Sequence, residues 1–76
     1  MDISKYNLTI KRHAFEQAIK RGIHPDMIEQ TLLKGRIKKL GKHGVKFINK
    51  GSKKNIICIG EIIGCELKII TIEEGD

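Results

Sequence analysis

The spacing of the hydrophobic residues changes at Gly35, and this change constrains the fold more than any other feature of the sequence. Before Gly35 apolar residues recur every three or four positions, as in helices, whereas after it they alternate or run together, as in strands. The chain has 76 residues, too few for two domains that each enclose a core. The sequence therefore predicts a single α+β domain over residues 1–76.

Two helices are expected in the first half. Thr9 is a suitable N-cap for a helix over about residues 9–21. Pro25 is well placed at a first helical position, and Asp26 complements the positive end of the helix dipole, so a second helix is expected over about residues 25–34. The link between them is short, so we expect the two helices to pack as neighbours.

Glycine-containing turns divide the second half into four expected strands. Their approximate ranges are 36–40, 45–49, 55–63 and 66–72. The predicted order is ααββββ, with two N-terminal helices packed on one face of a curved antiparallel sheet of about four strands. Alternation assigns Leu67, Ile69 and Thr71 to one face of the last strand. So short a chain gains little net stability from its core, which favours a homodimer or a bound partner chain.

Basic residues are concentrated in the middle of the chain. Fifteen Lys and Arg against nine Asp and Glu give a net charge of +6, and the segment Lys34–Lys54 contains nine basic residues and no acidic one. Glu73, Glu74 and Asp76 place acidic charge at the other end of the strand-rich half. The basic segment predicts a surface for a nucleic-acid backbone or for an acidic protein, and a solvated face accounts for it equally well.

The two cysteines are not spaced for a disulfide framework or a zinc site. Cys58 stands in an apolar run, where a free cysteine is expected to be buried as a small hydrophobic residue. No apolar stretch approaches the length of a membrane span or a signal peptide. These features predict a cytoplasmic protein without a membrane segment, a metal site or a cofactor.

His13 is the strongest single candidate for chemistry. His13, Gln17 and Arg21 are spaced four residues apart, so they form one polar stripe on the first helix. A histidine titrates near neutrality, and Arg12, Lys20 and Arg21 are suited to hold a phosphate. Metal-independent RNA cleavage needs these groups, because protons move at the ribose and the leaving oxygen while charge develops on phosphorus. The alternative is that His13 only holds the helix on the sheet.

The other histidines have simpler interpretations. His24 precedes Pro25 and is expected to cap the second helix. His43 lies in the turn 41–44 within the basic segment, where it either contacts a phosphate or is simply exposed. Tyr6 and Phe47 are too few aromatic residues for a base-stacking platform.

The segment Arg12–Ile23 also matches a known pattern. It resembles the H-A-x-x-R-x-x-x-R-G-I signature of a family of small uncharacterised domains, and the likeness extends to the helix that begins at Pro25 and to the end of the last strand, Ile69-Ile70-Thr71. Families of this kind are grouped with RelE-like toxins, which are metal-independent ribonucleases paired with antitoxin proteins. Gln17 stands where the family has its first arginine.

The resemblance implies a RelE-like fold and an RNA-binding, toxin-like domain that acts as a metal-independent endoribonuclease with an acidic antitoxin partner. His13 and Arg21 would be catalytic, with Gln17 and Thr71 supporting them. The residues expected to bind RNA phosphates are Arg12, Lys20, Lys38, Lys39, His43 and Lys46. The alternatives are a nucleic-acid-binding domain without catalysis and a basic module that docks an acidic protein.

Overall fold

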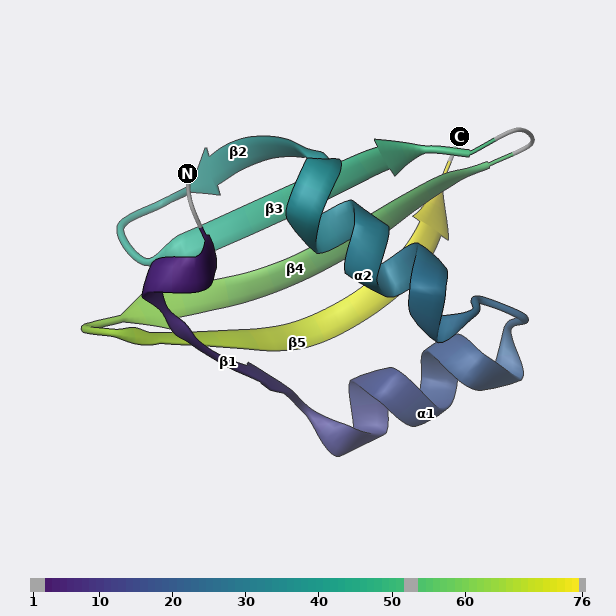
Figure 1. Cartoon of the computed structure of the whole chain (residues 1–76), viewed down its shortest axis with the longest axis horizontal. Coiled ribbons are helices and arrows are strands. Elements are labelled where there is room, and N and C mark those ends of the chain that lie inside the picture. Colours follow the sequence, from purple (N-terminus) through teal and green to yellow (C-terminus); the bar gives the residue numbers. More distant parts are fainter. Residues whose placement is uncertain (1–2, 52–53, 76) are drawn as a thin grey trace.

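The computed structural model describes residues 3–51 and 54–75 (Figure 1). Ser52 and Lys53 belong to the turn expected between strands 45–49 and 55–63, and they lie outside the described residues, as does Asp76. Neither helix in the described ranges combines the length and the apolar character needed to cross a lipid bilayer.

The chain begins with a short 3-10 helix and a strand, which precede both α-helices. These are η1 (Ile3–Lys5), β1 (Asn7–Ile10), α1 (Arg12–Lys20) and α2 (Pro25–Lys34). The strands that follow are β2 (Arg36–Leu40), β3 (Gly44–Lys50), β4 (Asn55–Ile63) and β5 (Glu66–Gly75). The bounds of α2 and β2 are those expected from the sequence, whereas β5 continues three residues beyond the expected end at Ile72.

The fold is α+β, but the predicted order ααββββ with four antiparallel strands is wrong. The described residues form a five-stranded sheet in the order β1-β5-β4-β3-β2. Its first strand, β1, comes before both helices in the chain and pairs parallel with β5, so the sheet is mixed. Four residues with apolar side chains at Leu8 and Ile10 were enough to form this edge strand.

The first helix also begins later than predicted, because Thr9 belongs to β1 and not to a helix cap. Thr9 pairs with Lys68 in the ladder between β1 and β5, and the ladder continues until the Lys11 amide donates to the Ile69 carbonyl at 2.9 Å. Lys11 is the N-cap of α1 and makes no side-chain capping bond. Strand pairing therefore prevents a helix from starting at Thr9.

The end of α1 is fixed by Gly22, which has a positive φ of 83°. This left-handed conformation allows the Gly22 amide to bond the Ile19 carbonyl and the Ile23 amide to bond the Ala18 carbonyl. Ile23 is then buried in the core, and the chain turns directly into α2.

The core lies between the two helices and one face of the sheet. Figure 1 shows α2 lying across β3 and β4, while α1 lies beside β5. Phe47 is completely buried under α2, and the small residues Ala14 and Ala18 let α1 approach β5 closely. The other side of the sheet, opposite α2, is called the open face below. Its side chains in β3 and β4 are only half-buried, as at Lys46 and Ile59.

A β-bulge in β5 overturns the predicted face assignment of the last strand. Ile69 pairs with Gly60 and Thr71 pairs with Ile59, so Ile70 is an extra residue. A Cβ atom at position 60 would collide with the Lys68 carbonyl oxygen, so glycine permits this close approach. The bulge shifts the alternation by one residue: Leu67 and Ile69 face the core, but the next core residue is Ile72 and not Thr71.

The two cysteines provide a test of the core. Cys58 in β4 is fully buried, and burial raises the pKa of its thiol from 9.0 to about 12, whereas Cys65 is exposed. At pH 8 we expect a thiol reagent to modify the folded protein at Cys65 alone, because the buried Cys58 stays protonated and inaccessible. The Cys65→Ser variant should label only in denaturant. Rapid labelling of that folded variant would show that β4 is not covered as described.

Candidate functional site

A cavity of about 360 Å³ lies between α1 and β5. We call it the α1–β5 cavity. Its principal lining residues are His13 and Gln17 from α1, Arg21 at the C-cap of α1, and Ile70, Thr71 and Ile72 from β5. The polar stripe predicted on the first helix therefore lies against the last strand, and it meets there a threonine 50 residues further along the chain than Arg21.

The position of the cavity follows from where β1 ends. The last backbone bond from this segment to β5 is the one from Lys11 to Ile69. Beyond it α1 replaces β1 beside β5, and its buried residues Ala14 and Ala18 fix which side of the helix faces the sheet. His13 and Gln17 follow on the neighbouring side of the helix, so they border the edge of β5.

Arg21 is held at the cavity by a hydrogen bond. Its Nη1 donates to the carbonyl oxygen of Ile72 at 3.2 Å, which satisfies a carbonyl on the part of β5 that β1 does not reach. A guanidinium carries five N–H donors, so this bond positions the side chain and leaves other donors for an anionic ligand. Arg21 therefore has a structural role at the site in addition to any chemical role.

Arg12 and Lys20, predicted as phosphate ligands, lie elsewhere on α1 and do not line this cavity. Arg12 is 93% exposed, and its Nε lies 3.3 Å from Oε1 of Glu16. Lys20 is exposed one helical turn beyond Glu16. The two cations thus belong to a second stripe of α1, next to the one formed by His13, Gln17 and Arg21.

A row of four residues crosses the open face and begins at the cavity. In this row Thr71 pairs with Ile59, Ile59 with Lys46, and Lys46 with Lys38. Two like charges directly opposite each other repel, so Lys38 and Lys46 together favour an anion above them. The row spans three strand spacings, about 14 Å from β5 to β2.

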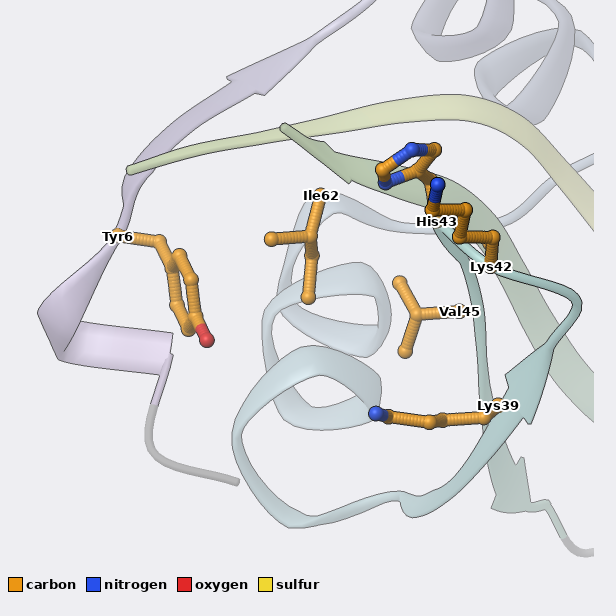
Figure 2. A pocket seen from close by; sticks show the side chains of 7 residues that line it. Tyr6, Lys39, Lys42, His43, Val45 and Ile62 are labelled. Carbon is orange, nitrogen blue, oxygen red and sulfur yellow. The ribbon is translucent and has the colours of Figure 1, made fainter. Parts of the chain in front are cut away.

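Lys39 and His43 lie on the other side of β2 and β3. Lys39 pairs with the buried Val45 and so belongs to the face of the sheet that α2 covers. Figure 2 shows Lys39 and His43 around a separate pocket with Lys42 and Tyr6. The six predicted RNA-binding residues therefore occupy three separate surfaces, and the structure brings none of them into the α1–β5 cavity.

His24 occupies the N-cap position of α2 but makes no side-chain capping bond. The pocket at Tyr6 and Lys42 was missed by the sequence reasoning, which considered Tyr6 only as one of too few aromatic residues. The sequence feature that could have indicated this pocket is the position of Lys42 and His43 in one turn.

Within residues 3–51 and 54–75, no group of three His, Cys, Asp or Glu side chains is arranged to hold a metal ion. Comparisons with protein-family models, curated proteins and solved structures found no match to this chain. The functional argument therefore rests on the geometry of the site and on the residues that form it.

The bond from Arg21 to Ile72 gives a prediction for stability. Arg21→Met retains most of the aliphatic side chain but removes the donor, so we expect the free energy of unfolding to fall by about 1 kcal/mol. Lys20→Met removes the same charge from the neighbouring exposed position and should change it by less than about 0.5 kcal/mol. Urea unfolding measures both. Equal effects of the two substitutions would mean that the bond does not stabilise the fold.

Proposed function

We propose that this protein is an RNA-binding, toxin-like domain that cleaves RNA without a metal ion. The observation that carries the proposal is that one cavity is lined by His13 from α1, Arg21 at the end of the same helix, and Thr71 from a distant strand. A row of residues leads from that cavity across the open face to two lysines. An acid–base group, a cation and a path for a phosphate backbone are thus combined in one small domain.

In the proposed reaction, a ribose 2′-oxygen attacks the adjacent phosphorus atom. The His13 imidazole accepts the 2′-hydroxyl proton, and the free N–H groups of Arg21 stabilise the negative charge that develops on the phosphorane. The bond between phosphorus and the 5′-oxygen breaks, and the leaving oxygen takes a proton from water. The products are a 2′,3′-cyclic phosphate and a 5′-hydroxyl, and His13 then returns its proton to solvent.

Gln17 and Thr71 have supporting roles in this proposal. The amide of Gln17 and the hydroxyl of Thr71 are donors on opposite walls of the cavity, suited to the non-bridging oxygens of the phosphate. The β5 bulge supports the role of Thr71, because without it the hydroxyl would point into the apolar core. Lys46 and Lys38 would bind neighbouring phosphates of the RNA strand where it leaves the cavity and crosses the open face.

Gln17 also favours a second candidate function, nucleic-acid binding without cleavage. The neutral amide lies in the middle of the polar stripe, so Arg21 is the one permanently charged side chain among the described residues that line the cavity. With less charge stabilisation the site would bind a phosphate without lowering the barrier to its cleavage.

The proposed partner is an acidic antitoxin protein, as the resemblance to toxin families implies. The cations of the open face support this proposal, because an acidic segment would pair with Lys38 and Lys46 and block the path of RNA. A short acidic reading frame beside the gene is the inexpensive observation that distinguishes a toxin pair from a basic docking module.

The cleavage proposal is tested with labelled RNA in EDTA. We expect the wild-type protein to cleave it and His13→Ala to lose between about 10²-fold and 10⁴-fold in rate, because the general base is removed. The control is His24→Gln, which removes an exposed histidine outside the cavity and should cleave at the wild-type rate.

Each result of this assay has a definite meaning. Cleavage by His13→Ala at the wild-type rate would show that the catalytic assignment is wrong. RNA binding without cleavage by the wild-type protein would select the non-catalytic function. If the wild-type protein neither binds nor cleaves RNA, the basic residues serve a protein partner.

The path across the open face is tested by the salt dependence of RNA binding. A contact with one phosphate of a single strand contributes about 0.7 to the slope of log K against log salt concentration. We expect Lys46→Gln to reduce the slope by about that amount. Lys11→Gln, which removes a charge near the end of β1, should leave the slope unchanged. Equal slopes for Lys46→Gln and wild type would exclude the open face as the path.

A further inference from the structure

A second pocket, of about 160 Å³, lies at another end of the sheet from the α1–β5 cavity, where the β2–β3 turn approaches the residue after η1 (Figure 2). We call it the Tyr6 pocket. Besides Tyr6, its lining side chains are Lys39, Lys42, His43, Val45 and Ile62. None of them lines the α1–β5 cavity, so a function of this pocket is separable from cleavage at His13.

The walls of the pocket are held by backbone hydrogen bonds between different elements. On one side, the Ile62 amide of β4 donates to the His43 carbonyl at 2.8 Å and so fixes the β2–β3 turn. On the other side, the Tyr6 amide donates to the Ile3 carbonyl at 3.1 Å, and the Asn7 amide donates to the Cys65 carbonyl at 2.7 Å. Both sides are thus positioned before any ligand binds, which lowers the entropic cost of binding.

The chemistry of the pocket has two parts. The half-buried Ile62 forms the accessible apolar floor, over the buried Val45, with the ring of the half-buried Tyr6 on one side. The rim is cationic. Figure 2 shows the Lys39 side chain extending toward the side of Tyr6, and Lys42 beside His43.

This combination selects an anionic ligand with a flat ring. Among the residues that the structure describes, none of those lining the pocket carries a carboxylate, so no described lining residue neutralises the charges of Lys39 and Lys42. An apolar floor next to an aromatic side chain favours a planar ring, and the cations on the rim favour a phosphate attached to it. A nucleotide contains both parts.

The volume narrows the choice of base. A protein cavity of about 150 Å³ accommodates one ring of the size of benzene. The Tyr6 pocket, at about 160 Å³, has the size of a single six-membered ring, so it would enclose more of a pyrimidine than of the larger fused rings of a purine. We propose that the Tyr6 pocket binds a pyrimidine nucleotide, with the ring on Ile62 beside Tyr6 and the phosphate on Lys39 and Lys42.

The proposal is tested by titrating the ¹⁵N-labelled protein with cytidine monophosphate while amide NMR shifts are recorded. We expect saturable shifts at Tyr6, His43 and Gly44, and at least tenfold weaker binding of adenosine monophosphate and of inorganic phosphate. The double variant Lys39→Gln/Lys42→Gln should bind cytidine monophosphate at least tenfold more weakly. Lys54→Gln, which removes a charge immediately before β4 and outside the pocket lining, should bind as the wild type does.

Several results would overturn the proposal. These are the absence of saturable shifts at the Tyr6 pocket, equal affinity for inorganic phosphate or the purine nucleotide, and unchanged binding by the double variant with a wild-type spectrum. A pyrimidine oligonucleotide titrated in parallel shows whether the pocket prefers the free nucleotide or a nucleotide within a strand.

The same titration of His13→Ala separates this proposal from the proposed function. That variant lacks the proposed general base but retains every residue of the Tyr6 pocket, so it should bind cytidine monophosphate with wild-type affinity. Binding there without any RNA cleavage would leave the pocket assignment intact and refute only the ribonuclease. RNA cleavage by the wild-type protein without nucleotide binding at the Tyr6 pocket would refute the pocket assignment and leave the ribonuclease proposal intact.

Discussion

The parallel pairing of β1 with β5 determines where most of the other elements lie. It joins segments whose first paired residues, Asn7 and Glu66, are far apart in the sequence, and it ends at the bond from the Lys11 amide to the Ile69 carbonyl. A longer β1 would occupy the edge of β5 along its whole length. Because β1 stops after four residues, α1 lies beside the rest of β5, and the α1–β5 cavity is the space that results.

The bulge at Ile70 makes a second contribution to the same site. It allows Ile72 to complete the core while Thr71 turns toward the open face, so one strand supplies both packing and a hydroxyl at the cavity. Arg21 then connects the two elements by bonding the Ile72 carbonyl. Packing of the core and placement of the polar side chains are therefore achieved by the same few backbone positions.

Local signals in the sequence predicted local structure well, and non-local pairing less well. The start of α2 followed from Pro25 and Asp26 and its end from Gly35, and the helical spacing of His13 and Arg21 correctly placed them on one stripe. The strand β1 was not predicted, because four residues gain their stability from a partner far along the chain. The division of the basic segment among different surfaces depends on strand register, which composition alone does not reveal.

The separation between β1 and β5 in the sequence has a consequence for folding. The hairpins β2–β3, β3–β4 and β4–β5 connect neighbouring segments, whereas the pairing of Asn7 with Glu66 closes a loop of 59 positions. Closing the larger loop costs more chain entropy, so the hairpins are favoured to form first and the β1–β5 ladder last. The amides of β1 should accordingly exchange with solvent deuterium sooner than those of β4, and the cavity beside α1 opens whenever that ladder does.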